Sequence, residues 1–444
     1  MLLEKLPPYN AEAEQAVLGS MMIDKEAVYI ALEILQAEDF YKDANQIIFT
    51  TMVNLEAQGA PIDMITLTEE LHRQNSMEKV GGVGYIAEVA NIVPTAANVR
   101  HYAEIVAEKA ILRRLIRVST NIANRCYENQ EDTHDLLDKA ERMILEIAEN
   151  RNFSGLVPLK QVLGTTLEKI EYLAGNKGNI TGVPSFFTDL DNMTSGWQPS
   201  DLIILAARPA MGKTSFGLNI AQNAAIRGET SVAIFSLEMS KEQLVQRLMS
   251  SEAMIDQHKL RTGRLLDEEW IRLTRAAQPL STAEIYIDDT PAISVLELRA
   301  KARRLKAEKG LGLIIIDYLQ LMQVGRRQEN RQQEISEISR SLKALARELN
   351  VPVIALSQLS RAVEQTQDKR PALSHLRESG ALEQDADLVM FIFREDYYNP
   401  ESEKPGIAEI IIAKHRNGPT GSVELGFIKE FTKFVNIDKH HSLN

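Results

Sequence analysis

The chain has 444 residues, a formal net charge of −12 and a single cysteine, Cys126. At about 100–200 residues per domain this length suggests two to four domains, and one cysteine excludes an internal disulfide framework or a multi-cysteine zinc site and fits a reducing compartment. No apolar run approaches the roughly 18 residues that span a bilayer, and residues 1–10 lack the basic stretch and apolar core of a secretory signal, so we expect a cytoplasmic protein with no membrane partner.

The acidic charge is confined to one part of the chain. A net charge of −12 argues against a nucleic-acid partner, because phosphate repels an acidic surface. Residues 1–150, however, hold 25 acidic and 13 basic residues, whereas residues 151–444 hold 37 of each sign. This asymmetry indicates two modules with different partners.

The first 150 residues are predicted to form a helical interaction domain. Apolar residues recur at helical spacing over residues 12–22, 25–35 and 45–56. Further helices are expected over residues 99–127 and 133–149. The buried side of the first of these should carry Tyr102, Ile105, Ile111, Leu115 and Ile122. No catalytic constellation is visible here, since the histidines are isolated in sequence.

Residues 151–182 are predicted to be a linker. An amphipathic helix over residues 162–173 lies between two Gly- and Asn-containing breaks. Such a helix either docks on a neighbouring domain or serves as a spacer, and the sequence leaves both interpretations open.

Residues 183–444 are predicted to form one α/β domain. Short apolar runs rich in β-branched residues alternate there with helical segments. This pattern indicates a mostly parallel sheet with helices on both faces. The predicted strands are residues 202–206, 232–235, 285–287, 313–316, 353–356, 388–392 and 407–413.

A phosphate-binding loop is predicted directly after the first strand. The loop runs into a helix beginning near Ser215, which is the strand–loop–helix context that phosphate binding requires. Backbone N–H groups face the phosphates, Lys213 supplies a positive charge, and the Thr214 hydroxyl suits a magnesium ligand. Ala207 stands where the usual motif has its first glycine. The nucleotide-contacting residues are expected to be Ala210, Met211, Gly212, Lys213, Thr214 and Ser215.

Two charged residues follow the second predicted strand. Glu238 stands at a strand end, where it could polarise an attacking water. The alternative is an acid at a helix N-terminus, stabilised by the helix dipole. Arg247 is placed either to stack its guanidinium on the base or to form a surface ion pair.

Two later strands also end in polar residues. Asp317 follows four apolar residues, which is the Walker B pattern of a carboxylate that holds magnesium through water. Gln358 ends the next strand and could sense the γ-phosphate, although a polar strand cap is the alternative. Lys414 and Arg416 follow the last predicted strand. They are typical of cations that reach a neighbouring subunit's γ-phosphate, or of a solvated hairpin.

Two stretches are locally basic. Residues 298–309 spread their charge around a helix, which favours a solvated helix over a DNA contact. Residues 360–387 form a loop that contains Arg361 and Arg377. Loops of this kind, arranged around a channel, could hold phosphates through arginines and backbone N–H groups without reading bases.

Taken together, the motifs closely resemble the bacterial DnaB-type hexameric replicative helicases over nearly the full length. The resemblance also rests on residues 10–19, 94–98, 235–240, 316–321, 356–361, 376–380 and 413–418. The family's phosphate loop likewise lacks the first glycine. His415 stands where we expect glutamine, between the two cations.

The resemblance implies a RecA-like ATPase domain joined by a linker helix to a helical N-terminal domain, assembled as a homo-hexamer around single-stranded DNA. ATP and Mg²⁺ would bind between subunits, with Lys414 and Arg416 arriving from the neighbour. It further implies 5′ to 3′ translocation at the replication fork and partnership with primase and a helicase loader. The implied DNA contacts are Arg361, Arg377, Glu378 and Gly380, the last two through backbone N–H groups only.

Two rival functions remain open on the sequence. A RecA-like recombination or repair ATPase shares the core but forms filaments, and it is disfavoured by the N-terminal domain and by residues 377–380. A loader or scaffold with a degraded ATP site would be expected to lack Glu238 or Arg416, and both are present.

Overall fold

The computed structural model describes residues 6–128, 132–133, 136–137, 139–140, 143–144, 147, 159–175, 180–323, 331–399 and 401–438, without the side chains of residues 160, 161, 165, 169, 172–175 and 377–379. The chain forms two compact units, Met1–Glu168 and Lys169–Asn444, which are described separately. Among the described helices, none combines the length and the apolar character needed to cross a bilayer.

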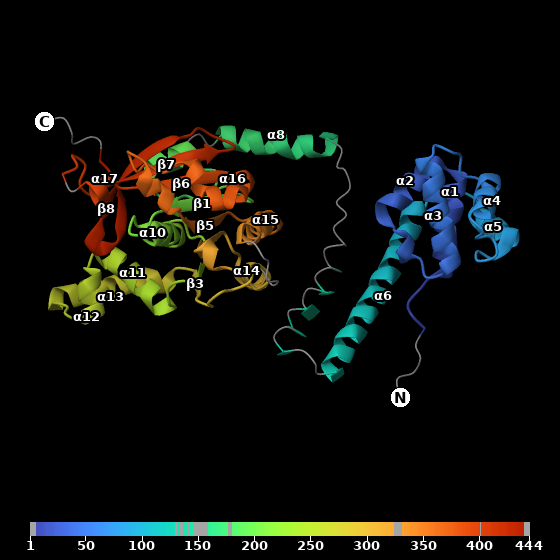
Figure 1. Cartoon of the computed structure of the whole chain (residues 1–444), viewed down its shortest axis with the longest axis horizontal. Coiled ribbons are helices and arrows are strands. Elements are labelled where there is room, and N and C mark those ends of the chain that lie inside the picture. The colour runs from blue at the N-terminus through green and yellow to red at the C-terminus, as the bar shows by residue number, and fades with distance from the viewer. Residues whose placement is uncertain are drawn as a thin grey trace. The chain divides into compact units, whose positions relative to one another are not determined.

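The N-terminal unit is helical throughout its described part (Figure 1). Its first three helices and its last occur where periodicity predicts them. Two further helices, α4 and α5, were not predicted. The elements are α1 (Ala11–Ile23), α2 (Lys25–Ile34), the 3-10 helix η1 (Ala37–Asp39), α3 (Asp43–Ala57), α4 (Met64–Arg73), α5 (Gly82–Asn91) and α6 (Val99–Glu128).

Side-chain caps fix where several of these helices begin. Asn10, Asp24 and Asp63 each accept a hydrogen bond from a backbone N–H in the first turn of α1, α2 and α4. Glu14 is buried among the packed helices, and its carboxylate accepts hydrogen bonds from the Tyr41 backbone N–H and the Asn45 side chain. A buried carboxylate satisfied in this way holds the unit together rather than serving chemistry.

The prediction for the buried side of α6 is wrong over most of its length. Val99, Ala103, Val106 and Ala110 are the buried residues, because only this first part packs against α1 and α2. Tyr102 and Ile105 are partly buried, and Ile111 and Ile122 are also only partly covered. Leu115 is exposed. The helix expected over residues 133–149 lies largely outside the described residues.

Helix α8 (Leu159–Gly175) contains the helix predicted for the linker. Its described apolar side chains are exposed, namely Leu159, Val162, Leu163, Leu167 and Ile170. The amphipathic pattern of the sequence is therefore present.

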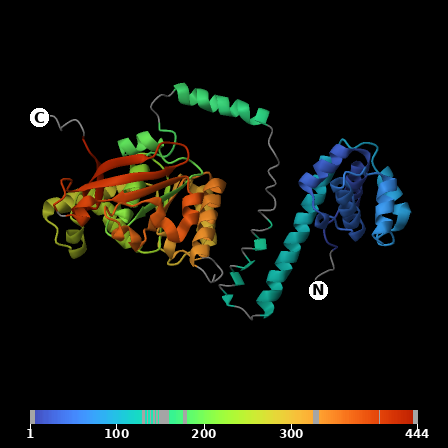
Figure 2. The ribbon, with the colours of Figure 1, turned by 45° about the horizontal axis from the view of Figure 1, so that its top comes forward.

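The described residues of the C-terminal unit contain a nine-stranded sheet in the order β3-β2-β4-β5-β1-β6-β7-β8-β9. Figures 1 and 2 show this sheet among its helices. The six strands from β3 to β6 are parallel, and β7 to β9 are antiparallel. All seven predicted strands are present, while β8 and β9 were not predicted. The strands are β1 (Leu202–Ala207), β2 (Val232–Ser236), β3 (Ile285–Asp288), β4 (Leu313–Asp317), β5 (Val353–Gln358), β6 (Leu388–Phe393), β7 (Ile407–His415), β8 (Gly421–Ile428) and β9 (Lys433–Asn436).

Helices cover both faces of this sheet, as predicted. Alternate residues of β1 show the two layers, because Ile203 and Leu205 join one buried cluster and Leu202 and Ile204 join the other. The first cluster includes helix α10 and the second includes α14 and α15. The helices are α9 (Thr188–Thr194), α10 (Lys213–Ile226), α11 (Lys241–Ala253), α12 (Gln257–Thr262), α13 (Asp267–Thr282), α14 (Val295–Lys309), α15 (Arg331–Leu349), α16 (Gly380–Asp385) and α17 (Glu395–Tyr398), with 3-10 helices η2 (Leu319–Leu321), η3 (Arg361–Gln365), η4 (Leu373–Ser379) and η5 (Lys429–Phe431).

Strand direction determines which residues share an edge of the sheet. The parallel strands β2, β4, β5, β1 and β6 all end at one edge, which we call the carboxyl edge. The antiparallel strand β7 ends at the opposite edge, where Val389 at the start of β6 pairs with Lys414. The loop after β1 and the end of β7 therefore lie at opposite edges of the sheet.

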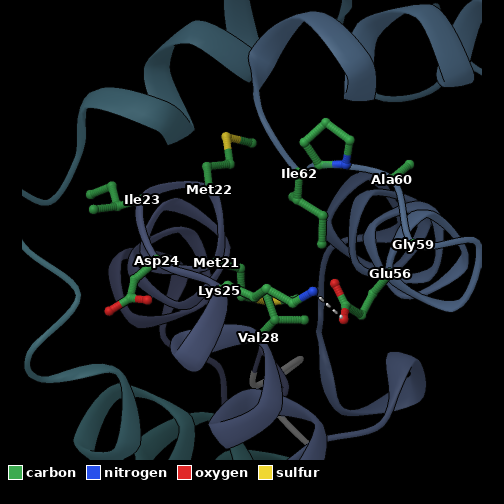
Figure 3. A pocket seen from close by; sticks show the side chains of 11 residues that line it. Met21, Met22, Ile23, Asp24, Lys25, Val28, Glu56, Gly59, Ala60 and Ile62 are labelled. Atoms are coloured by element: carbon green, nitrogen blue, oxygen red, sulfur yellow. Dashed lines mark ion pairs between the residues drawn. The ribbon is translucent and has the colours of Figure 1, made fainter.

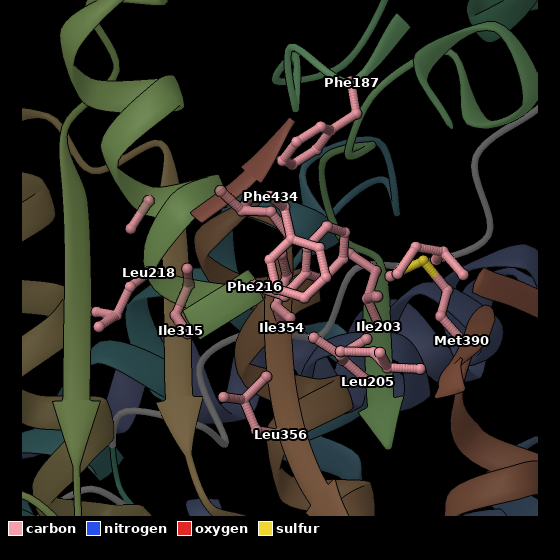
Figure 4. Packing of buried hydrophobic residues seen from close by; sticks show 14 of the residues in the cluster. Phe187, Ile203, Leu205, Phe216, Leu218, Ile315, Ile354, Leu356, Met390 and Phe434 are labelled. Carbon is pink, nitrogen blue, oxygen red and sulfur yellow. The ribbon is translucent and has the colours of Figure 1, made fainter. Parts of the chain in front are cut away.

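Phe216 on α10 anchors one face of the sheet. Its ring lies 5.2 Å from that of Phe187 and 4.9 Å from that of Phe434 (Figure 4). Phe216→Ala is expected to lower the free energy of unfolding by about 3–5 kcal/mol, since it leaves a cavity among these rings. Urea unfolding of the full chain measures this. Tyr397→Ala, at a half-exposed position, should cost far less, and equal losses would contradict the packing role.

Candidate functional site

The loop after β1 is shaped by two residues with left-handed backbone. Gly212, at the start of α10, has φ of 97°, and Ala210 has φ of 65°. A side chain at Gly212 would also approach the Phe434 ring to 3.0 Å. Glycine is therefore required at Gly212 both by conformation and by the close approach of β9. The loop leads directly into the N-terminus of α10, where free N–H groups and the helix dipole favour an anion.

Lys213 and Thr214 face the carboxylate that ends β4. The Thr214 hydroxyl donates to Asp317 Oδ2 at 2.7 Å, and Lys213 Nζ lies 3.6 Å from Asp317 Oδ1. Asp317 is buried, and its Oδ1 has no hydrogen-bond partner among the described residues. Burial lowers the pKa of Lys213, and the charges of Asp317 and Glu238 oppose that shift. The Lys213 ammonium also lies 4.2 Å from the centre of the Tyr318 ring.

Glu238 stands in the loop between β2 and α11. It is exposed and lines the same pocket as Lys213. The alternative, that Glu238 is an acid in the first turn of a helix, does not hold. Helix α11 begins at Lys241 with Ser240 as its cap, and the acid in its first turn is Glu242. Glu238 is therefore placed to act on a molecule in the pocket.

Arg247 on α11 also lines this pocket. Burial lowers the pKa of its guanidinium, and the charges of Asp317 and Glu238 oppose the shift. Its Nε is buried without a hydrogen-bond partner, and no ion pair joins it to another residue in the described part of the chain. The ion-pair alternative is thus not observed.

Gln358 ends β5 and is held by a residue that the sequence analysis missed. Gln320 in η2 accepts from the Gln358 backbone N–H at 3.2 Å and donates to the Ser357 hydroxyl at 2.8 Å. Because Gln320 takes up main-chain groups, the Gln358 side chain remains available to the pocket that it lines. Gln320 thereby ties the end of β5 to the segment after β4.

These residues share one pocket of about 490 Å³ at the carboxyl edge. The predicted residues that line it are Ala210, Gly212, Lys213, Thr214, Ser215, Glu238, Arg247 and Gln358. Met211 is instead buried beneath the loop, and Asp317 lies behind Thr214. The pocket is also lined by residues that were not predicted to contact nucleotide. They are the phosphate-loop residues Ala207, Arg208 and Pro209, and the more distant residues Gln257, Arg394, Phe427, Lys429 and Thr432.

Arg394 and Phe427 form one wall of the pocket. The Arg394 guanidinium lies 4.5 Å from the centre of the Phe427 ring and donates to Asp396 at 2.9 Å. Arg394 is buried, and its Nε has no hydrogen-bond partner among the described residues. The one signal that could have revealed Arg394 is its position two residues after the strand predicted over residues 388–392. Phe427 lies in β8, which was not predicted.

Lys414 and Arg416 do not line this pocket. They lie at the opposite edge of the sheet, against the C-terminal end of α16. Lys414 Nζ donates to the carbonyls of Glu383, Gln384 and Ala386, and Arg416 donates to that of Gln384 at 2.9 Å. Burial lowers the pKa of Lys414, with a further contribution from the Arg416 charge, and the acids Asp387, Glu383 and Asp385 oppose it.

Asp201 lies beside these cations, at the start of β1. Its pKa is raised to about 6 by burial and, to a lesser extent, by the charge of Asp387, while Lys343 and Arg416 oppose the shift. A raised pKa means that ionisation is costly in the folded state, so stability is lost as the pH rises through 6.

Asp201→Asn is therefore expected to raise the free energy of unfolding at about pH 8 by up to about 1 kcal/mol, after allowance for partial exposure, and to change it little near pH 4. Urea unfolding at the two pH values measures this. An equal gain at both would show that the charge of Asp201 is not responsible.

The segment after β5 contains the predicted DNA contacts. Arg361 is exposed in η3, and Gly380 opens α16, where an added side chain would meet open space. The backbone of Arg377 and Glu378 belongs to η4, but their side chains lie outside the described part. Arg208 of the phosphate loop donates two hydrogen bonds to Glu364 in η3, at 2.9 and 2.7 Å. These bonds connect the phosphate loop to the segment after β5.

The basic helix α14 is a solvated helix, as favoured on the sequence. Four of its cations contact acids of the same unit. Arg299 and Arg303 contact Glu348, Lys301 contacts Asp288 and Glu297, and Arg304 contacts Glu308. A patch neutralised in this way offers little attraction to DNA.

A second hollow, of about 370 Å³, lies in the N-terminal unit (Figure 3). Met21, Met22, Val28 and Ile62 supply apolar lining, and the ion pair of Lys25 with Glu56, at 3.2 Å, crosses it. The hollow has neither a phosphate loop nor clustered metal ligands. Among the described residues of the whole chain, no group of three or more His, Cys, Asp and Glu could hold a metal ion.

Two family models match the chain. The DnaB-like helicase N terminal domain matches residues 6–108, and the DnaB-like helicase C terminal domain matches residues 182–436. The chain is 57% identical to the replicative DNA helicase DnaB of Geobacillus stearothermophilus, over 98% of this chain and 96% of that protein. It is 56% identical to the replicative DNA helicase DnaC of Bacillus subtilis (strain 168), over 99% and 97%.

A solved structure agrees with these relatives. The structure of a DnaB-like replicative helicase and its interactions with primase has a TM-score of 0.78 and 39% identity, and the alignment covers 97% of this chain and all of that one. A solved structure of an isolated ATPase domain has a TM-score of 0.62 and 46% identity, covering 64% of this chain and all of that one. The fold of the chain is therefore that of the proteins it resembles in sequence.

Proposed function

Since this chain belongs to the family of DnaB-like replicative DNA helicases, we propose that six copies form a ring that hydrolyses ATP to move 5′ to 3′ along one DNA strand and separate the duplex. The observation that carries this proposal is the separation of the site's parts. The groups proposed to bind and activate ATP line one pocket or, as Asp317 does, contact a residue that lines it, whereas two cations lie at the opposite edge of the sheet.

Each residue of the pocket has a role that fits its position. The loop amides and Lys213 hold the phosphates, and Arg247 is available to stack on the base. Glu238 orients and polarises the attacking water, since it is exposed and free of the helix that follows. Gln358 contacts the γ-phosphate from the end of β5 and relays its presence to the segment after that strand.

Thr214 and Asp317 would hold Mg²⁺ with the β- and γ-phosphates. The buried Oδ1 of Asp317 fits this role, because among the described residues it has no hydrogen-bond partner and can still accept a hydrogen bond. When bound, the ion neutralises charge that develops on the phosphate oxygens.

Lys414 and Arg416 are proposed to complete the pocket of the adjacent subunit. Within one chain they lie at the wrong edge of the sheet for their own nucleotide. A head-to-tail arrangement of copies would bring one edge against the next, and it forms a ring when the rotation between copies closes. A cation supplied in trans in this way stabilises the charge of the transferring phosphoryl group.

The segment of residues 361–380 is proposed to hold single-stranded DNA in the centre of the ring. Arg361 and Arg377 would contact phosphates, and Glu378 and Gly380 would offer only backbone N–H groups. The contact of Arg208 with Glu364 supports a link between this segment and the phosphate loop. Binding of this kind reads no bases.

Arg377→Ala is expected to weaken binding of an oligo-dT strand equally with that of mixed sequences, and to lower the salt slope by about one ion. Fluorescence anisotropy over a salt series measures this. Arg304→Ala, on the solvated helix α14, is the matched control and should leave the slope unchanged. An unchanged slope in the Arg377 variant would remove that residue from the phosphate contacts.

The N-terminal unit is proposed to bind proteins rather than DNA. Its acidic charge would repel the strand, whereas the rest of the chain is neutral overall. A relative of similar structure interacts with primase, which supports primase as a partner of this chain. A loader is a further partner implied by the family, and the replication fork in the cytoplasm is the expected place of action.

The rival functions are weaker. A recombination ATPase would not need the N-terminal domain that the family model matches at residues 6–108. A scaffold with a degraded ATP site would not preserve the complete pocket.

The experiment that tests the proposal is unwinding of forked duplexes labelled on one strand. We expect ATP-dependent separation when a free 5′ tail is present on the strand to be encircled, and none when only a 3′ tail is present. Separation from a 3′ tail alone, or pairing of homologous strands without unwinding, would contradict it.

A further inference from the structure

Lys414 is fully occupied within its own subunit. Its ammonium donates at 2.5, 3.2 and 2.8 Å to the carbonyls of Glu383, Gln384 and Ala386. An ammonium has three N–H donors, and all three are used here. Lys414 therefore cannot contact the phosphate of an adjacent subunit while it keeps these bonds.

The acceptors are the carbonyls at the C-terminal end of α16. The last four carbonyls of a helix have no partner within the helix, and the helix dipole makes this end negative. Asp385 adds an acid to the same place, and among the described residues its buried Oδ2 has no hydrogen-bond partner. The end of α16 is thus a well-formed receptor for one ammonium.

Arg416 is held differently from Lys414. It donates one hydrogen bond to the Gln384 carbonyl, its guanidinium lies 3.6 Å from Asp387, and about half of its side chain is exposed. A guanidinium has five N–H donors, so most of them remain free. Arg416 can reach a neighbouring phosphate without leaving α16, whereas Lys414 must leave it.

Helix α16 also follows directly on the proposed DNA segment. η4 ends at Ser379 and α16 begins at Gly380, with no residue between them. Leu376 of η4 and Leu382 of α16 are buried in the same cluster, so the two elements pack as one piece. A movement of the C-terminal end of α16 is therefore expected to move η4, which belongs to the segment proposed to bind the DNA strand.

We propose that the C-terminal end of α16 is a docking site for the Lys414 ammonium. When the adjacent subunit binds ATP, the ammonium leaves this site and contacts the γ-phosphate of that subunit. The departure of the ammonium releases α16 and the DNA segment attached to it. This inference rests on the proposed function, because it assumes that Lys414 acts in trans. The inference adds a second position for the Lys414 ammonium. It also connects the nucleotide of the adjacent subunit to the segment proposed to bind DNA.

Hydrogen–deuterium exchange of the full chain tests the exchange of partners. In the absence of nucleotide, α16 amides should exchange slowly in the wild type and several-fold faster in Lys414→Met, which lacks the ammonium. Saturation with ADP, beryllium fluoride and Mg²⁺ should bring the wild type close to Lys414→Met. The same addition should leave α16 of the variant unchanged.

Lys306→Met is the matched control. Lys306 donates to the carbonyl of Leu349 at the end of α15, so it caps another helix of the same unit by the same kind of bond. Its replacement should not alter the nucleotide response of α16. If the nucleotide-dependent change in α16 exchange is lost in both variants, the cause is a general loosening of the fold, and the docking site is overturned.

The same samples separate this inference from the proposed function. Protection of residues 208–215 reports nucleotide binding, and light scattering reports the hexamer. If either is missing, the proposed function fails. If both are present but wild-type α16 exchange does not respond, the docking site alone is overturned.

Strand affinity supplies a second measurement. Beryllium fluoride with ADP should change the affinity of the wild type for an oligo-dT strand by about fivefold or more, which is the lower end of usual coupling between sites. In Lys414→Met this nucleotide-dependent change should be largely lost. An undiminished change would contradict the route through α16.

Discussion

Replacing Lys213 by alanine is expected to lower DNA-stimulated ATP hydrolysis at least about a hundredfold, the usual loss when one preorganised charge is removed from a reacting phosphate or oxyanion. Lys213 is largely buried, opens α10 and faces Asp317. Nothing else in the described pocket occupies this place. Its removal should therefore weaken nucleotide binding as well as turnover.

The measurement is steady-state phosphate release with saturating oligo-dT, together with binding of a fluorescent ATP analogue. Lys404→Ala is the control, since Lys404 is an exposed lysine of the same unit that pairs with Glu424. Turnover retained in Lys213→Ala would refute the phosphate-loop assignment.

Arg416→Ala is expected to abolish turnover while leaving nucleotide affinity nearly unchanged. The loss should reach about 10³-fold or more, as for other arginines that act on a phosphoryl group in trans. Affinity should persist because the arginine stabilises charge that develops during phosphoryl transfer, whereas the loop amides and Lys213 hold the bound nucleotide. The same two assays measure both effects.

Mixing this variant with Lys213→Ala provides the decisive control. An interface that takes its pocket from an Arg416→Ala subunit and its arginine from a Lys213→Ala subunit is complete. Turnover above that of either variant alone is therefore expected. Turnover of the mixture no higher than that of either variant alone would instead place the arginine in its own subunit's site.

The parallel part of the sheet could be predicted from the sequence because its strands are buried on both faces. Runs such as Leu202–Ala207 and Leu313–Asp317 are almost continuously apolar. Strands β8 and β9 were missed because they lack this signal. β8 alternates exposed and buried residues, and Phe434 is the one buried residue of β9.

The missed strands explain much of what was missed in the site. Phe427 lies in β8, and Lys429 and Thr432 lie in the turn that follows, so three pocket residues belong to an unpredicted hairpin. Gln320 was missed for another reason. Its partners are the main chain of Gln358 and the Ser357 hydroxyl, on a strand about 38 residues later, and no sequence pattern marks such a contact.

The two cations show a further limit. Their spacing indicated that they point the same way, and both reach the Gln384 carbonyl. No sequence pattern could have identified this acceptor, because every residue type has a backbone carbonyl. Only the fold brings the end of α16 to the two cations. The length of α6 shows the same limit, because helical periodicity did not reveal that α1 and α2 cover only its first part.

Electron microscopy of the full chain with ADP, beryllium fluoride, Mg²⁺ and an oligo-dT strand tests the central proposal most directly. We expect six-membered rings with one strand in the central hole, and with Arg416 of one subunit at the nucleotide held by Lys213 of the next. An open helical filament, or nucleotide sites in which Arg416 and Lys213 belong to the same subunit, would contradict it.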